Sequence, residues 1–253
     1  MPVNVERHAR HILLKEIGGA GQQRLSEAHI TVIGVGGLGA PAALYLAAAG
    51  VGKLRLVDPD IVSLDNLQRQ ILYRTKDVGR PKIEAAHEAL MALDPQIEVE
   101  GIQETAGAET LERLVSGTDL ILDGCDSFKT RLAVNDAAIK ARTPLISGAV
   151  GRWSGQIGVF APHAGQDAAC YRCLVPDIPP DEEPCSQVGI VGALTGLVGS
   201  AMALEAIKWI TGAGEPLLSR LMIFEGLEAQ ARTVRLSRDP ACPSCCHVQS
   251  DGH

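Results

Sequence analysis

The sequence predicts a doubly wound α/β fold with a mainly parallel sheet, and three observations support this prediction. Short apolar, β-branched segments alternate with helical segments from residue 29 to residue 148, a spacing typical of right-handed crossovers between parallel strands. A glycine-rich turn follows the first of these strands. The composition fits a large aliphatic core, because 46% of the residues are hydrophobic and only 3% are aromatic.

The elements follow in order along the chain. Residues 4–27 look helical and precede the first strong strand, so we expect an arm outside the sheet. In the alternating part we expect strands at 29–34, 54–57, 97–102, 120–122 and 144–148. The helices between them are expected at 40–49, 81–93, 109–115 and 129–142. Beyond residue 148 the alternation stops, and an antiparallel extension is predicted from strands at 155–160, 221–224 and 231–236.

Two segments of this second half need separate comment. Residues 175–186 hold four prolines and four acidic residues, so this segment is predicted to be a surface loop without regular structure. Residues 188–204 are 17 uncharged residues followed at once by Glu205 and Lys208. Their Gly/Ala/Ser content favours a buried or interface helix over a membrane span.

Charge and composition exclude several classes of protein. The formal net charge is −7, from 23 basic and 30 acidic residues. A general nucleic-acid binder needs a basic face, so any anion that this chain binds must be held by a local site. The first residues are charged where a signal peptide needs an apolar run, and we therefore expect a cytoplasmic protein without a membrane segment.

The first chemical motif is the turn Gly34-Val-Gly-Gly-Leu-Gly39, which lies between a strand and a helix. Such glycines let backbone N–H groups approach a phosphate at the helix N-terminus. Asp58 ends the second strand, 19 residues after Gly39, where a carboxylate can accept hydrogen bonds from ribose hydroxyls. The combination predicts a Rossmann-like nucleotide site and leaves NAD and ATP open.

The next segment favours ATP. In Asp65-Asn-Leu-Gln-Arg-Gln-Ile71, the side chains of Asn66 and Arg69 share one face of a turn, and Lys82 begins the following helix. Two fixed cations near a glycine turn suit a triphosphate better than the single pyrophosphate of a dinucleotide. The alternative is that both basic residues are merely solvated.

Asp126 follows the predicted strand 120–122, in Asp123-Gly-Cys-Asp126. The carboxyl edge of such a sheet is where these folds bind ligands, and a carboxylate there is suited to hold Mg²⁺ on phosphates. The alternative for Asp126 is capping of the next helix.

Two C-x-x-C pairs form the most specific pattern in the sequence: Cys170 with Cys173, and Cys242 with Cys245. Two such pairs supply the four thiolates of a closed, structural Zn²⁺ site, and a site of this kind supports the fold without taking part in catalysis. The alternatives are four unrelated buried thiols, or ligation through the neighbouring Cys246 in place of Cys245.

Cys185 lies at the end of the proline-rich loop, just before the helix expected from residue 189 onward. A thiol near a helix N-terminus has the access and the lowered pKa of a nucleophile. Asp181, Glu182 and Glu183 oppose formation of its thiolate, so a passive, exposed cysteine is the alternative.

Together these motifs resemble the MoeB/ThiF/HesA family, relatives of the ubiquitin-activating enzymes. The resemblance spans nearly the whole chain and is carried by GVGGLGAPAALYLAAAGVGKLRLVDPDIVSLDNLQRQILY (34–73), DVGRPK (77–82), PLISGAVGRWSGQIGVF (144–160), CYRC and CPSC. It implies a homodimer that uses ATP and Mg²⁺ to adenylate the C-terminal glycine of a ubiquitin-like sulfur carrier. Such carriers serve molybdopterin, thiamin or thiolation pathways.

The resemblance also implies roles for individual residues. Arg10 would reach the active site of the partner subunit, Asp126 would bind Mg²⁺, and Cys185 would lie where the carrier tail passes, with an acyl or persulfide link in some members. The implied nucleotide site consists of Gly36, Gly37, Asp58, Asp60, Asn66, Arg69, Gln70, Lys82 and Asp126. The implied catalytic set is Arg10, Arg69, Lys82, Asp126 and Cys185.

Two positions depart from the family pattern. The usual Asp-Cys-Thr-Asp-Asn is here Asp123-Gly-Cys-Asp126-Ser127, and the usual C-x-x-C-Gly ends in Cys245-Cys246. These departures put in doubt a polar role for the neighbours of Asp126 and the identity of the fourth zinc ligand.

We therefore expect one adenylation domain over residues 1–253: an arm (1–28), a nucleotide-binding half (29–150) and a carrier-binding and zinc half (151–253). With no sulfur-transfer domain expected after the last residue, sulfur would come from a sulfurtransferase or cysteine desulfurase, or through Cys185. The alternatives are an NAD-dependent oxidoreductase, for which no acid–base signature is present, and a non-catalytic scaffold of the same fold.

Overall fold

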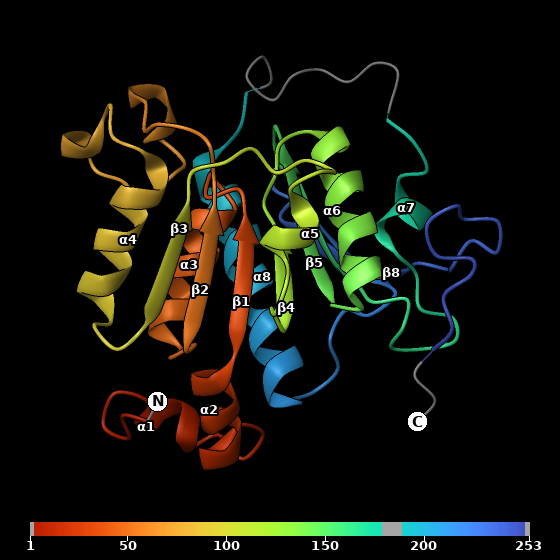
Figure 1. Ribbon diagram of the computed structural model, residues 1–253, viewed down its shortest axis with the longest axis horizontal. Coiled ribbons are helices and arrows are strands. Elements are labelled where there is room, and N and C mark those ends of the chain that lie inside the picture. Colours follow the sequence, from red (N-terminus) through yellow and green to blue (C-terminus); the bar gives the residue numbers. More distant parts are fainter. Residues whose placement is uncertain (1–2, 179–188, 251–253) are drawn as a thin grey trace.

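A computed structural model describes residues 3–178 and 189–250, and within them the chain forms one twisted sheet of eight strands in the order β3-β2-β1-β4-β5-β6-β7-β8 (Figure 1). The first five strands in that order are parallel, and β6, β7 and β8 are antiparallel. The strands are His29–Ile33 (β1), Lys53–Val57 (β2), Glu98–Ile102 (β3), Leu120–Asp123 (β4), Leu145–Gly151 (β5), Ser154–Phe160 (β6), Arg220–Glu225 (β7) and Gln230–Arg235 (β8).

Helices cover both faces of the parallel part, as the sequence predicted (Figure 1). The helices are Ala9–Ile12 (α1), Gly18–Glu27 (α2), Gly39–Ala48 (α3), Lys82–Leu93 (α4), Leu111–Leu114 (α5), Phe128–Ala141 (α6), Tyr171–Leu174 (α7) and Gly192–Thr211 (α8). Two 3₁₀ turns, Leu64–Asn66 (η1) and Thr75–Asp77 (η2), lie between β2 and α4. Helices α3, α4 and α8 contribute to one apolar core, and α5 and α6 contribute to the other.

The central strand β1 shows why both faces are covered. Ile30 and Val32 are fully buried in the core beneath α3 and α8, whereas Ile33 packs into the core beneath α5 and α6. Because successive side chains of a strand point to opposite faces, an apolar run is stable only in a sheet that is buried on both sides. The short apolar segment of the sequence therefore becomes the central strand.

Helix α8 is a core helix of the sheet. By length and composition it is the one helix in the described residues that could cross a membrane. Instead it packs against α3, β5 and β6, with Val198 and Met202 fully buried. Gly148 of β5 makes this packing possible, because a Cβ atom there would lie 2.6 Å from the Met202 sulfur.

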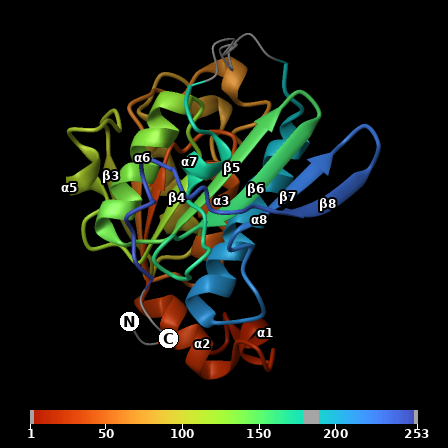
Figure 2. The same ribbon diagram turned by 90° about the vertical axis from the view of Figure 1, so that its right-hand side faces the viewer.

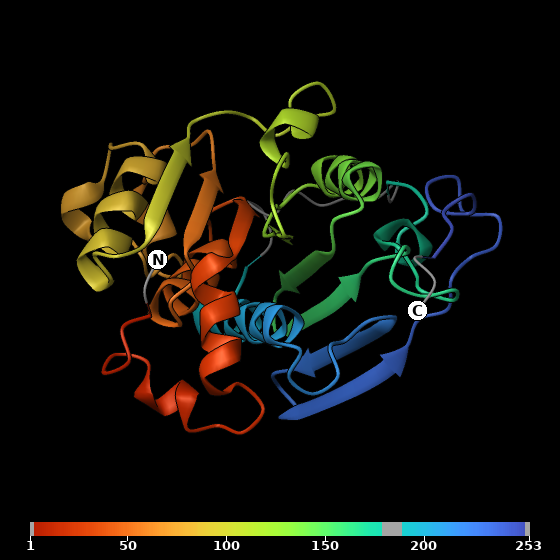
Figure 3. The same ribbon diagram turned by 60° about the horizontal axis from the view of Figure 1, so that its bottom comes forward.

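The N-terminal arm differs from the single helical segment predicted for residues 4–27. It forms two helices, α1 and α2, because Gly18 adopts φ +58° and turns the chain between them. Both lie beyond the amino ends of the strands, and α2 lies beside α8 (Figure 3). Arg24 fixes this contact by donating to the carbonyl of Ile210 at 3.2 Å.

The antiparallel extension has the predicted strands. Strands β7 and β8 form a hairpin that projects from the body of the molecule (Figure 2). Every residue of β8 is exposed, which leaves the second edge of the sheet open to solvent. Within the predicted loop 175–186, residues 176–178 have no helix or strand, and residues 179–186 lie outside the described part of the chain.

Candidate active site

The glycine turn joins β1 to α3 at the carboxyl edge of the sheet, and its geometry requires glycine. Gly34 has φ +83°, and a Cβ atom on Gly39 would lie 2.0 Å from the Gly34 carbonyl oxygen. Gly34 also touches the loop after β4, where a Cβ on Gly124 would lie 3.0 Å from the same oxygen. The turn and the Asp126 loop thus meet backbone to backbone.

Asp58 is held beneath this turn at the end of β2 and is 4% exposed. One carboxylate oxygen accepts the Val35 N–H at 2.8 Å, and the other accepts the Asp60 N–H at 2.9 Å. Burial raises the pKa of Asp58, and the Lys82 ammonium and the two backbone N–H groups partly oppose that rise. The predicted ribose-binding carboxylate is therefore a rigid part of the glycine turn.

Lys82 is 4% exposed although it carries a charge. Its ammonium lies 2.7 Å from Asp60 Oδ2 and 3.7 Å from Asp58 Oδ1. The Lys82 backbone N–H also donates to the Asp60 carbonyl at 2.9 Å, which fixes the first turn of α4 to the segment after β2. A buried ammonium paired in this way is not a solvated surface lysine, so the alternative interpretation of Lys82 is wrong.

The segment 66–70 lies against the glycine turn and the first turn of α8. Asn66 and Arg69 are half-buried, and the Arg69 guanidinium donates to the Asp65 carbonyl at 3.1 Å. Thr195 of α8 connects the three parts. Its hydroxyl donates to the Arg69 carbonyl at 3.4 Å, and its side chain would meet a Cβ on Gly37 at 3.2 Å. Sequence reasoning missed Thr195, because no local motif surrounds it.

Gln70 leaves an unsatisfied polar atom at the turn. It is 5% exposed, and its Oε1 atom is buried without a hydrogen-bond partner among the described residues. A Cβ on Gly36 would lie 3.6 Å from its Nε2 atom. Because a buried amide oxygen normally finds a donor, this orphaned acceptor beside the glycines fits a site completed by a ligand.

Tyr73, the last residue of the motif 34–73, fixes the turn through the backbone of Val35. Its hydroxyl donates to the Val35 carbonyl at 2.7 Å. Burial, together with the nearby carboxylates of Asp58 and Asp60, raises the pKa of the Tyr73 phenol, which therefore stays protonated and remains a donor. The positions of the Val35 N–H and C=O groups are thus fixed by two buried side chains.

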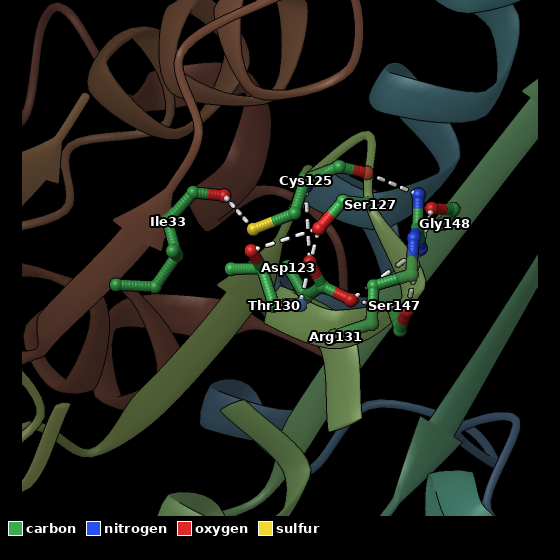
Figure 4. A network of polar contacts seen from close by, with 8 residues as sticks. All are labelled: Ile33, Asp123, Cys125, Ser127, Thr130, Arg131, Ser147 and Gly148. Atoms are coloured by element: carbon green, nitrogen blue, oxygen red, sulfur yellow. Dashed lines mark hydrogen bonds and ion pairs between the residues drawn. The ribbon is translucent and has the colours of Figure 1, made fainter. Parts of the chain in front are cut away.

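Asp126 is exposed at the end of the loop after β4. The N-cap residue of α6 is Ser127, whose hydroxyl accepts the Thr130 N–H at 3.2 Å (Figure 4). The neighbouring Cys125 is buried, and its thiol points toward the Ile33 carbonyl at 3.6 Å. The Asp126 carboxylate therefore lies at the same sheet edge as the glycine turn, in reach of solvent and ligands.

A buried polar network lies directly behind this loop (Figure 4). Asp123 is 0% exposed and accepts hydrogen bonds from the Ser147 hydroxyl at 2.7 Å and from the Cys125 N–H at 3.0 Å. The Arg131 guanidinium pairs with Asp123 at 3.4 Å and donates to the Gly148 carbonyl at 2.6 Å and to the Cys125 carbonyl. Nothing in the local sequence marked Arg131.

The four cysteines of the two C-x-x-C pairs come together although 69 residues separate the pairs in sequence. All four Sγ atoms lie within 4.8 Å of one another. The contacts are 3.9 Å (Cys170–Cys173), 3.6 Å (Cys170–Cys242) and 3.5 Å (Cys173–Cys245). Sulfur ligands about 2.3 Å from a tetrahedral Zn²⁺ have this mutual spacing, so the donor set fits zinc.

The neighbourhood of the cluster supports the same assignment. Cys245 is 0% exposed and Cys246 is exposed outside the cluster, so Cys245 is the fourth thiol. Burial raises the pKa of Cys245 to about 12, and a cation is the usual means of holding such a thiol as a thiolate. Asp239 donates its N–H to the Cys173 sulfur at 3.4 Å.

One predicted site residue is not brought to this edge, and another lies outside the described part of the chain. Arg10 lies exposed in α1, beyond the amino ends of the strands, whereas the glycine turn is at their carboxyl ends (Figure 1). A contribution of Arg10 to a site would require a second chain. Cys185 lies outside the described residues.

The comparisons with known proteins identify the family. Residues 8–244 match the model of the ThiF family, so the chain belongs to that family. It is 41% identical over 245 residues to a sulfur carrier protein adenylyltransferase from Thermus thermophilus, covering 95% of this chain and 90% of that one. It is 43% identical over 245 residues to the sulfur carrier protein ThiS adenylyltransferase of Escherichia coli, covering 97% and 96%.

A solved structure shares the fold. A crystal structure of Escherichia coli MccB with ATP superposes with a TM-score of 0.78 at 25% sequence identity, over 89% of this chain and 68% of that one. The predicted membership and the predicted fold class are thereby confirmed.

Proposed function

We propose that this chain is an adenylyltransferase that joins AMP from ATP to the C-terminal glycine of a ubiquitin-like sulfur-carrier protein. The observation that carries the proposal is the convergence of the glycine turn, Asp58, the buried Lys82, the 66–70 segment and the Asp126 loop at one sheet edge. Family membership over residues 8–244 supports the same activity.

The chemistry needs positioned cations and no general base. A carboxylate is already ionised near neutral pH, so the carrier's terminal carboxylate attacks the α-phosphorus directly and pyrophosphate leaves. Catalysis then depends on in-line positioning and on offsetting the charge of the leaving group. Arg69 and Lys82 supply positive charge at the triphosphate, and the N–H groups of the glycine turn donate hydrogen bonds to phosphate oxygens.

Asp126 is the residue that would hold Mg²⁺ there. Its exposed carboxylate is an oxygen donor of the kind that Mg²⁺ prefers, at the edge where the triphosphate lies. When bound, Mg²⁺ would supply positive charge that offsets the charge of the phosphates. Asp58 binds the ribose hydroxyls, and the Gln70 amide oxygen accepts a donor of the nucleotide.

The remaining parts of the proposal concern metal, partner and sulfur. Zn²⁺ on Cys170, Cys173, Cys242 and Cys245 connects two distant segments of the carrier-binding and zinc half and has no role in the chemistry. A homodimer supplies Arg10 to the site of the partner subunit, since α1 lies at the far end of its own sheet. A separate sulfurtransferase or cysteine desulfurase delivers the sulfur, in the cytoplasm.

The test is incubation with ATP, Mg²⁺ and a purified carrier, either of the ThiS type or of the MoaD type. Intact-mass spectrometry is expected to show one carrier gaining the mass of an adenylyl group, which is AMP less one water, and the carrier that reacts names the pathway. Arg69→Ala should slow adenylate formation on the order of 10²-fold, because it removes a positive charge that stabilises the transition state. Lys76→Ala, which removes an exposed charge from the same segment, is the control.

The outcomes separate the alternatives. If neither carrier gains AMP and nucleotide still binds, the scaffold interpretation holds. If NAD stabilises the protein against heat and ATP does not, the oxidoreductase interpretation holds.

A further inference from the structure

We propose that Arg131 is a positioning residue that holds the Asp126 loop in place, and that it thereby sets the affinity of the site for the divalent cation that accompanies ATP. This inference rests on the proposed function, because it concerns the cation of the same nucleotide site. The residue lies on α6, five positions beyond Asp126, and is 6% exposed.

The Arg131 guanidinium reaches the loop from behind. It donates to the carbonyl of Cys125, the residue directly before Asp126. The remaining donors hold the guanidinium against β5: Nη1 donates to the Gly148 carbonyl at 2.6 Å and to the Ser147 hydroxyl at 3.1 Å. One planar group therefore connects the loop to a strand of the central sheet, as Figure 4 shows.

The counter-charge of this guanidinium is fully enclosed. Asp123, at 0% exposed, lies 3.4 Å from Arg131, and its other contacts come from the Ser147 hydroxyl and the Cys125 N–H. The backbone on both sides of Cys125 is therefore held, the N–H by Asp123 and the carbonyl by Arg131. A buried ion pair with its remaining lone pairs satisfied is rigid, because breaking it leaves a charge without a partner.

Arg131 also meets a third element. The phenol of Tyr171, in α7, feels the positive charge of this guanidinium, which partly offsets the rise that burial causes in the pKa of Tyr171. Tyr171 packs edge-to-face on Phe160 of β6 at 5.4 Å between ring centres, and its N–H donates to Asn135 of α6 at 2.8 Å. The guanidinium therefore has little room to shift.

The consequence of this network concerns the Asp126 carboxylate. The Asp126 side chain is exposed, and the backbone that carries it sets where its carboxylate can reach. On one side that backbone touches the glycine turn through Gly124, and on the other side Arg131 and the Ser127 cap hold it. Loosening Arg131 should spread the Asp126 carboxylate over several positions and weaken its hold on a cation. Residues that orient a metal ligand typically change metal affinity 10- to 100-fold when replaced.

The experiment measures binding of AMPCPP, the analogue whose α–β bridge cannot be cleaved, to the full chain, once with saturating Mg²⁺ and once with EDTA. In the wild type, Mg²⁺ should tighten binding. Arg131→Lys keeps the charge and loses the planar fork, and we expect it to reduce that Mg²⁺-dependent gain about tenfold. Binding in EDTA should change much less, because the glycine turn is untouched.

The matched control is Arg55→Lys. Arg55 is also largely buried and donates to the carbonyls of Leu114 at 3.0 Å and Ser116 at 2.9 Å while pairing with Glu100 at 3.1 Å. It lies on β2 at the side of α5, away from the Asp126 loop. It should lose comparable stability and keep the Mg²⁺-dependent gain, which separates positioning from general destabilisation.

Ser147→Ala covers the case in which Arg131→Lys does not fold. It removes one acceptor of the guanidinium and one donor to Asp123, and a loss of about threefold in the Mg²⁺-dependent gain is expected. A normal Mg²⁺ gain in Ser147→Ala, and in Arg131→Lys if that variant folds, overturns the inference while leaving the proposed function intact. A wild type whose analogue binding ignores Mg²⁺, or that does not bind the analogue, overturns both.

Discussion

Asp58 and Lys82 show how burial and a neighbouring charge together set the pKa of one side chain. Their charged atoms lie 3.7 Å apart, and both residues are 4% exposed. Burial raises the pKa of Asp58, and Lys82 is the largest influence that opposes this rise. The balance leaves a carboxylate able to accept ribose hydroxyls close to a cation suited to phosphate.

The first prediction follows from that balance. Lys82→Met removes the ammonium and keeps the buried stem, so the pKa of Asp58 should rise further above its ordinary value. Because a raised carboxyl pKa means that the folded chain holds the proton more tightly than the unfolded chain, Asp58 should then favour folding less as pH rises through its folded pKa. Carbon-13 NMR titration of the Asp58 carboxyl measures the shift, and Asp58→Asn assigns the resonance.

The matched control removes the same number of positive charges as Lys82→Met. Lys76→Met removes an exposed lysine from the segment before α4 and should leave the Asp58 titration where it is in the wild type. An Asp58 pKa that stays unchanged in Lys82→Met would contradict the prediction.

Residues with a motif around them could be read from the sequence, and residues without one could not. Asp58, Asn66, Arg69 and Lys82 all lie in short patterns, and the structure gathers them at one edge. Thr195 acts through a contact with the Arg69 carbonyl, far away in sequence, and Arg131 acts through the carbonyls of Gly148 and Cys125. A hydrogen bond to a carbonyl selects no side chain on the other partner, so it leaves no paired signal along the chain.

At the scale of elements, α8 carries glycines of two kinds. A Cβ on Gly199 would lie 2.5 Å from both the Leu38 carbonyl oxygen and the Pro41 ring, whereas a Cβ on Gly196 would meet no atom of residues 3–178 or 189–250 within 4 Å. Gly199 is therefore needed for the close approach of α8 to the start of α3. Gly196 has no such packing role, and alanine at this position would stabilise the helix.

The second prediction compares these two positions. Gly199→Ala should lower the free energy of unfolding by about 1–3 kcal/mol, because α8 must move away from the helix that follows the glycine turn. Gly196→Ala should raise it by about 0.5–1 kcal/mol through helix propensity alone. Urea denaturation of both variants provides the measurement, and equal effects of the two substitutions would refute the packing argument.

The elements themselves were largely predictable because their periodicities are local. The five parallel strands, the helices between them and the three antiparallel strands appear where the apolar patterns placed them. The arm was the exception: a left-handed glycine conformation at Gly18 divides a segment whose composition is helical throughout. Composition reports helix propensity, whereas the break depends on a backbone angle that α2 needs in order to reach α8.

At the scale of the whole molecule, the cysteine cluster joins distant parts of the chain. Ser244, between Cys242 and Cys245, donates to Asp136 of α6 at 2.6 Å and accepts from Arg172 of α7 at 2.7 Å. The C-terminal segment is therefore fastened to α6 by side chains as well as by the thiols. Loss of a metal there should therefore lower the stability of the whole fold.

The third prediction concerns that metal. The purified protein should hold about one zinc ion per chain by mass spectrometry of the metal content. Cys242→Ser should lose the zinc and lower the free energy of unfolding by at least about 3 kcal/mol. Cys246→Ser, at the exposed neighbour outside the cluster, should keep both zinc and stability. A zinc-free wild type of full stability would refute the assignment.

One feature at the centre of the molecule limits how the site can vary. Gly34 and Gly124 touch through bare backbone, so no side chain separates the phosphate turn from the carboxylate loop. The two loops therefore behave as one rigid unit. Substitutions can change the side chains that line the site, but the spacing between the loops is set by direct contact between two peptide planes.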